Sequence, residues 1–63
     1  MNTRQVIKLV TDDGWYEIKT GGGSHRQYHH PVKPGKVTVP FHGKNKEVDP
    51  WIVKSIKKQA GLQ

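Results

Sequence analysis

The chain has 63 residues, no cysteine, and 11 lysines and arginines against five aspartates and glutamates, which gives a formal net charge of +6. This length predicts a single domain over residues 1–63, close to the lower limit for a self-sufficient core, and the lack of cysteine excludes disulfides and thiolate metal ligands. Since the sequence has neither the ~20 apolar residues of a membrane span nor the apolar stretch of a signal peptide, we expect a cytoplasmic protein without a membrane partner.

The basic charge narrows the classes of partner. With a sequence pI near 9.9, nucleic acid is the first expectation and an acidic protein the second, ahead of an anionic membrane. The alternative is that the basic residues are simply exposed to solvent and bind no partner.

Residues 3–14, TRQVIKLVTDDG, are predicted to form an amphipathic helix. Either Asn2 or Thr3 can cap its first turn, because each has a side-chain oxygen that accepts from a free N–H group. Gly14 can supply the left-handed residue that commonly ends a helix. The apolar residues recur at helical spacing on one face: Val6, Ile7, Leu9 and Val10.

Three strand-like segments come next: residues 15–20 (WYEIKT), 24–30 (SHRQYHH) and 36–40 (KVTVP). The glycines at 21–23 provide a turn between the first two. Pro34 and Gly35 suit the central positions of a type II turn between the second and the third. Such short connections predict an antiparallel meander rather than parallel crossovers.

Beyond a polar loop at residues 41–48, Asp49 and Pro50 predict the start of a second helix, as N-cap and first helical residue. This helix is expected over residues 51–60, and Gly61 stands where it would end. The order of elements predicts an α+β fold of the type α-β-β-β-α, with a three-stranded antiparallel sheet and two helices on one of its faces. The apolar stripe of the second helix is Ile52, Val53, Ile56 and Ala60.

The four histidines, His25, His29, His30 and His42, do not suit a metal site. On a strand, His25 and His29 share a face but lie ~13 Å apart, and the adjacent His29 and His30 point to opposite faces. We therefore predict no metal and no cofactor. Ser24 and His25 also diverge on a strand, which argues against a serine nucleophile activated by its neighbour.

Alternation along the second strand places Tyr28 opposite in phase to His25. If Tyr28 faces the helices, His25 faces the open side of the sheet, and His30 shares the phase of Tyr28 at the strand end. Packing or RNA contact is expected for His29 and His30. Most aromatic residues are expected to pack within or beside the core rather than to stack on bases: Trp15, Tyr16, Tyr28, Phe41 and Trp51.

A single histidine can act on RNA, because RNA supplies its own nucleophile, the ribose 2′-hydroxyl. A neutral imidazole, whose ordinary pKa is about 6.5, can remove that proton near neutral pH. Basic side chains can meanwhile hold the phosphate and offset the charge that develops on it. The glycines at 21–23 would allow a sugar-phosphate backbone to approach closely, although a merely flexible loop is the alternative.

The chain resembles the HicA family of bacterial and archaeal toxins. The segments that carry this resemblance are, in order, TRQVIKLVTDDGW, GSHRQYHHPVKPGKVTVP, HGKNKEV and KSIKKQAGL. The resemblance implies a fold similar to a double-stranded-RNA-binding domain and metal-independent ribonuclease activity against mRNA, which blocks translation. It also implies neutralisation by a HicB antitoxin. The essential histidine of the family lies in its Gly-Ser-His motif, which corresponds to His25.

We therefore expect His25 to be the catalytic general base and His42 to be a candidate accessory acid. Members usually have a basic or polar residue before Gly-Ser-His, where this chain has Gly22. If that residue grips phosphate, this chain would either bind RNA more weakly or rely on Lys19 and Arg26 instead. The expected substrate-binding residues are Gly23, Ser24, Arg26, Lys33, Lys36, Lys44 and Lys46.

The expected partners are mRNA and a HicB-type antitoxin that covers His25, and DNA contact is expected only through the antitoxin. An acidic antitoxin would be steered to the basic toxin by charge. The alternative is a non-catalytic double-stranded-RNA-binding module of the same fold. A DNA-binding protein is a third class, and it predicts that duplex DNA competes as well as RNA does.

Overall fold

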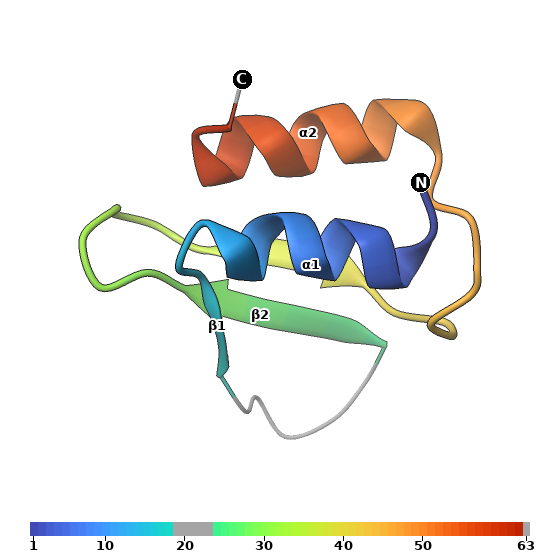
Figure 1. Ribbon diagram of the computed structural model, residues 1–63, viewed down its shortest axis with the longest axis horizontal. Helices are drawn as coiled ribbons and strands as arrows, with labels where there is room; N and C mark the ends of the chain where they lie inside the picture. Colours follow the sequence, from blue (N-terminus) through green and yellow to red (C-terminus); the bar gives the residue numbers. More distant parts are fainter. Residues whose placement is uncertain (19–23, 63) are drawn as a thin grey trace.

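A computed structural model describes residues 1–18 and 24–62, and its elements follow the order α-β-β-β-α (Figure 1). The elements are α1 (Thr3–Asp12), β1 (Tyr16–Ile18), β2 (His25–His29), β3 (Val37–Pro40) and α2 (Pro50–Ala60). The strands form one antiparallel sheet in the order β1-β2-β3, so the predicted α+β meander is confirmed. The predicted glycine turn at 21–23 and the end of the first predicted strand lie outside the described residues.

The two helices begin in different ways. Asn2 caps α1 through a capping box, because its side chain accepts from the Gln5 N–H at 2.9 Å while the Gln5 side chain accepts from the Asn2 N–H at 2.8 Å. Asp49 is the N-cap of α2 and Pro50 is its first residue, as predicted, but the Asp49 side chain makes no capping hydrogen bond among the described residues. The main-chain carbonyl of Asp49 instead accepts from the Ile52 N–H at 2.9 Å. Across the described part of the chain, no helix has the length and apolar character needed to cross a membrane.

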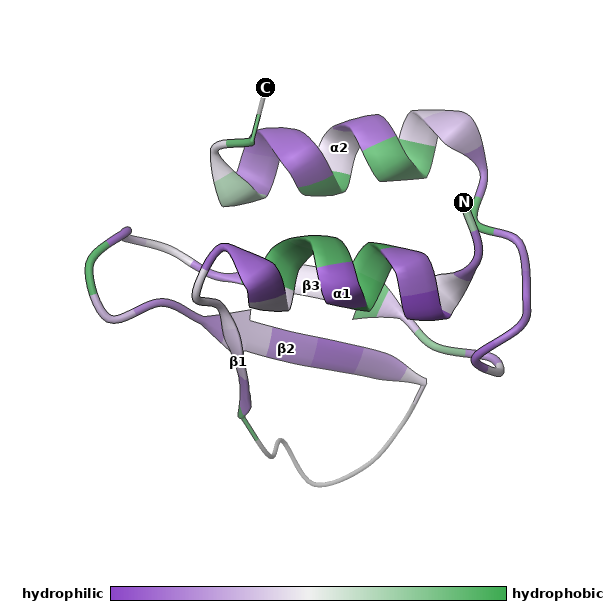
Figure 2. Ribbon diagram, in the orientation of Figure 1, coloured by the Kyte–Doolittle hydropathy of each residue, from purple (hydrophilic) through white to green (hydrophobic). Residues whose placement is uncertain are grey.

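The core lies between the helices and one face of the sheet. Tyr28 is paired with Val37, and both are buried together with Val39, so this face of β2 and β3 meets the helices. In Figure 2 the apolar parts of α1 and α2 lie on the sides that face each other, while β2 is hydrophilic along its length. The predicted inward position of Tyr28 is confirmed. The buried helical residues that complete this core are Val6, Val10, Val53, Ile56 and Ala60.

His30 joins the end of β2 to the end of α1. Its Nδ1 accepts from the main-chain N–H groups of Val32 and Lys33, each at 3.0 Å. Nδ1 is therefore unprotonated, so Nε2 carries the proton and donates to the Asp13 carbonyl at 2.8 Å. The ring also packs edge-on against Trp15, with 5.2 Å between ring centroids. Both ring nitrogens are thus used, and packing accounts for this histidine.

Gly14 sits against the His30 ring in a conformation that only glycine adopts easily. Its φ is +103°, and an added Cβ would lie 2.8 Å from the His30 Nε2. We expect Gly14→Ala to lower the free energy of unfolding by about 1–3 kcal/mol from backbone strain, with a further loss from the clash. Urea unfolding measures this effect. Gly35→Ala is the matched control, because Gly35 has φ +81° but no atom within 4 Å of an added Cβ; equal losses for the two variants would contradict the contact with His30.

Lys33 ties the β2–β3 turn to the ends of both helices. Its ammonium group donates to the Asp13 carboxylate at 2.5 Å and to the Ala60 carbonyl at 3.0 Å. The Lys33 hydrogen bond is the main reason that the pKa of the Asp13 carboxyl is lowered, and a weaker contribution comes from the Trp15 indole N–H. The ionised Asp13 carboxylate therefore stabilises the fold.

This ion pair predicts an acid-sensitive contribution to stability. Because the folded pKa of Asp13 lies below the ordinary value of 3.8, its contribution is fully present above that value and is lost as the pH falls through the folded pKa. The advantage of the wild type over Asp13→Asn in urea unfolding should thus be constant from pH 7 to about pH 5 and shrink below 3.8. A difference that stays constant down to pH 2 would contradict the ion pair.

Candidate functional site

His25 is the first residue of β2 and lies on the open face of the sheet. It is paired with Pro40 of β3, three residues before the buried Tyr28, so its side chain points away from the helices. The residue is exposed. Within residues 1–18 and 24–62, no hydrogen bond engages its imidazole ring. The predicted orientation of His25 is confirmed, and its ring nitrogens are available to a bound molecule.

Other polar side chains share this open face. Gln27 and His29 follow His25 at alternate positions of β2, and His29 is paired with Tyr16 of β1. Tyr16 is 51% exposed, so the expectation that the aromatic residues mostly pack in or beside the core does not hold for it. Cross-strand partners on one face bring their Cβ atoms within about 5.5 Å. His25 thus stands at one end of a polar surface that also presents the ring of Tyr16.

Contacts behind the strand fix the position of the Ser24–His25 segment. The Ser24 carbonyl accepts from the Phe41 N–H at 2.5 Å. The Arg26 guanidinium lies 3.9 Å from the centroid of the Phe41 ring and forms an ion pair with Glu17 at 3.4 Å. Arg26 is paired with Val39, so its side chain is on the helix-facing side of β2, opposite to His25. Phe41 thus holds the Ser24–His25 segment in place. This contact depends on the register of β2 and β3, so no local sequence pattern could have predicted it.

A pocket of about 260 Å³ adjoins the His25 end of the sheet. Pro40, the partner of His25, lines it together with His42 and Lys46. The loop that carries these residues is held to the start of α1, because the Lys46 carbonyl accepts from the Thr3 N–H at 2.9 Å. The Lys44 carbonyl similarly accepts from the next main-chain N–H of α1 at 3.0 Å. Three of the predicted residues, His42, Lys44 and Lys46, are thereby brought to the same end of the molecule as His25.

The structure separates two other predicted residues from this group. Lys33 and Lys36 lie in the turn between β2 and β3, at the opposite end of β2 from His25. The Lys33 ammonium group is already bound by Asp13 and Ala60, whereas Lys36 is exposed. Gly23 lies outside the described residues. Lys33 and Lys36 therefore lie apart from Lys44 and Lys46, and Arg26 lies behind the strand.

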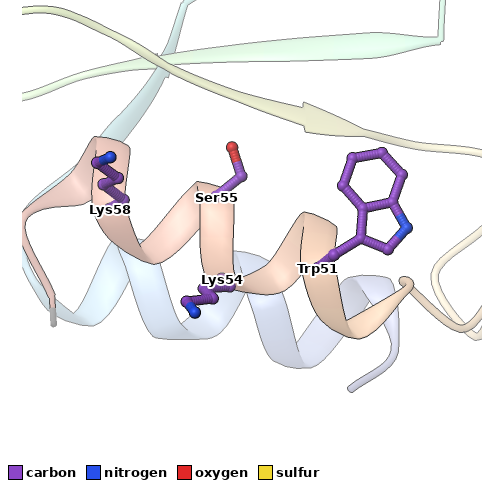
Figure 3. Close-up of a pocket in the computed structure, with 4 residues that line it drawn as sticks. All are labelled: Trp51, Lys54, Ser55 and Lys58. Carbon is purple, nitrogen blue, oxygen red and sulfur yellow. The ribbon is translucent and has the colours of Figure 1, made fainter.

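The outward side of α2 carries a further exposed aromatic residue. Trp51 is 71% exposed, in contrast to the core or rim position expected for most aromatic residues. Together with Lys54, Ser55 and Lys58 it lines a shallow hollow of about 390 Å³ (Figure 3). The spacing 51, 54, 55, 58 places these side chains on one helical face, away from the buried stripe. The helical period of the sequence could therefore have revealed this exposed face.

Comparison with known proteins agrees with this architecture. A family model described as the HicA toxin of bacterial toxin–antitoxin systems matches residues 3–62. A chain in the solved structure of a toxin–antitoxin complex from Streptococcus pneumoniae is 29% identical, with 98% of each chain covered and a TM-score of 0.78. No curated protein sequence matches the chain closely enough to count as a relative. Because the family model covers nearly the whole chain, the protein belongs to the HicA family of toxins of bacterial toxin–antitoxin systems.

Proposed function

We propose that this toxin is a metal-independent endoribonuclease that cuts mRNA and so blocks translation, with His25 as its catalytic general base. The observation that carries the proposal is the exposed imidazole of His25, which stands on the open face of the sheet with no protein partner among the described residues. The net charge of +6 favours a polyanionic substrate. Membership in the HicA toxin family supports a role in arresting growth.

In the proposed reaction, the His25 imidazole removes the proton of a ribose 2′-hydroxyl. The 2′-oxygen attacks the adjacent phosphorus, and the bond from phosphorus to the 5′-oxygen of the next nucleotide breaks. The products are a 2′,3′-cyclic phosphate and a 5′-hydroxyl, and the leaving oxygen takes one proton. His42 is a candidate donor of that proton because it lines the pocket next to Pro40, and a lysine or solvent could serve instead.

The surrounding residues suit electrostatic and positioning roles. Lys44 and Lys46 present cations at the His25 end of the sheet, where they can offset the negative charge that develops on the phosphate. Arg26 acts behind the strand, since its stacking on Phe41 and its ion pair with Glu17 hold the start of β2. Gly23 and Ser24 remain predicted contacts to the RNA backbone.

Lys33 and Lys36 are the weakest members of the predicted substrate-binding set. Both lie at the far end of β2 from His25, and the Lys33 ammonium group is engaged within the protein. RNA that extends along the open face beyond His29 could still reach Lys36.

The open face also suits an antitoxin. The similar Streptococcus pneumoniae chain was solved in a toxin–antitoxin complex, which supports a protein partner here, and the family points to a HicB-type antitoxin. Inhibition is simplest if that partner covers His25 directly. An acidic antitoxin would be steered by the positive charge of the toxin, so association should slow as the salt concentration rises.

The proposal is tested with the wild-type toxin, EDTA, and RNA and DNA strands of the same sequence. We expect cleavage of the RNA alone, because DNA lacks the 2′-hydroxyl, and we expect EDTA to have no effect. Binding without cleavage would favour the alternative of a non-catalytic RNA-binding module. Duplex DNA that competes as well as RNA would favour a DNA-binding protein.

A further inference from the structure

The exposed side of α2 forms a second surface with features suited to RNA. This α2 outer face consists of Trp51, Lys54, Ser55 and Lys58. In Figure 3 Trp51, Ser55 and Lys58 extend from the same side of the helix, whereas Lys54 extends from the other side in this view. Within the described residues the Trp51 indole makes no hydrogen bond, and 71% of the residue is exposed. A large aromatic ring is thus available beside two cations.

The cations of the α2 outer face have no acidic partner in the described part of the chain. Four of the five carboxylates form ion pairs with other cations: Asp12, Asp13, Glu17 and Glu47. The fifth, Asp49, precedes α2. Lys54 and Lys58 therefore present positive charge to solvent, and the partner that complements this charge is an anion.

The start of α2 lies near the strand partner of His25. Ile52, next to Trp51 in α2, lines the same pocket as Pro40 and His42. Pro40 is in turn the strand partner of His25. The Gln59 side chain accepts from the Thr38 N–H at 3.2 Å, which places α2 along the outer edge of β3. The first turn of α2 and the strand partner of His25 thus border one pocket.

We propose that the α2 outer face binds the single-stranded RNA that flanks the cleaved bond. One base stacks on the Trp51 indole, and the ammonium groups of Lys54 and Lys58 contact phosphates. Stacking on aromatic side chains beside a basic surface is the usual way in which proteins bind single strands. This inference rests on the proposed ribonuclease function and extends its substrate contacts beyond the sheet.

Fluorescence separates this contact from binding elsewhere. The chain has two tryptophans, and Trp15 is only 2% exposed while Trp51 is 71% exposed. The His25→Ala toxin is titrated with a single-stranded RNA oligonucleotide of roughly 16 nucleotides, so that the RNA stays intact. We expect quenching of the exposed tryptophan and its protection from acrylamide. Adding Trp51→Ala should weaken RNA binding by about 5- to 150-fold, the range for loss of one base stack.

Two further sets of variants distinguish stacking from general loss of structure or charge. Trp51→Phe keeps an aromatic ring and should retain much of the affinity. Lys54→Gln and Lys58→Gln should each reduce the slope of log affinity against log salt by about 0.7, the effect of one phosphate contact on a single strand. Lys8→Gln is the matched control, because Lys8 lies on α1 and is paired with Asp12. It removes the same charge and should leave the slope unchanged.

The outcomes separate this inference from the proposed function. If the wild type cuts RNA through His25 but Trp51→Ala binds RNA as tightly as its parent, the inference fails and the proposed function stands. If Trp51→Ala instead weakens only the complex with the antitoxin, the α2 outer face is a protein interface and the inference fails. If the wild type neither binds nor cuts RNA, the proposed function itself fails, and the inference fails with it.

Discussion

His25→Ala should slow RNA cleavage by about 10²–10⁴-fold, the contribution that a positioned general base usually makes. The 2′-hydroxyl then has no positioned group to take its proton, while the basic side chains that hold the phosphate are unchanged. Since His25 is exposed and none of the described residues bonds to its ring, its removal should change the free energy of unfolding by no more than about 0.5 kcal/mol. Single-turnover cleavage in EDTA and urea unfolding measure the two quantities.

His29→Ala is the control for this variant. His29 is exposed on the same strand and the same face, but it lies ~13 Å from His25 along β2. It should therefore change the cleavage rate far less than His25→Ala does. Equal losses for the two variants, or wild-type cleavage by His25→Ala, would contradict the assignment of His25 as the base.

Tyr28→Ala should remove a large part of the stability of the protein. Tyr28 is 2% exposed and lies at the centre of the core between the sheet and the helices. Truncating a large buried aromatic residue to alanine costs about 3–5 kcal/mol. A chain of 63 residues has a total stability of roughly 3–9 kcal/mol at the usual value per residue. The loss is therefore comparable with the whole stability of the fold.

Far-UV circular dichroism and urea unfolding measure the effect of Tyr28→Ala. Tyr28→Phe is the control, because it keeps the ring and removes only the hydroxyl group. It should stay folded, with a change of about 1 kcal/mol or less. A folded Tyr28→Ala protein with near-wild-type stability would show that the core does not depend on this ring.

Local patterns in the sequence were enough to predict most of the fold. Alternation in β2 placed Tyr28 inside and His25 outside, because side chains of a strand change face at every residue. The predicted turn and helix-end glycines, Gly14, Gly35 and Gly61, all have positive φ values. These features depend on a few neighbouring residues, so spacing and residue type determine them.

The features that the sequence did not reveal depend on contacts between distant segments. The bonds from His30 and Lys33 to Asp13 span 17 and 20 residues, so no local pattern could show that Lys33 is engaged away from His25. The position of Arg26 behind the strand depends on Phe41, which the register of β2 and β3 brings close. The helical spacing of residue 51 relative to the apolar stripe of α2 already indicates that Trp51 is exposed. We instead expected a core or rim position for it, because tryptophan is usually buried.

The central claim is that the ribose 2′-hydroxyl is the nucleophile in a reaction that needs no metal. It is tested most directly with two RNA oligonucleotides of one sequence in EDTA, one of which has a single 2′-deoxy nucleotide on the 5′ side of the cleaved phosphate. We predict that the wild-type toxin cuts the all-ribose strand, leaving a cyclic phosphate, and does not cut the other at that position. Equal cleavage of both strands would contradict the proposed role of His25.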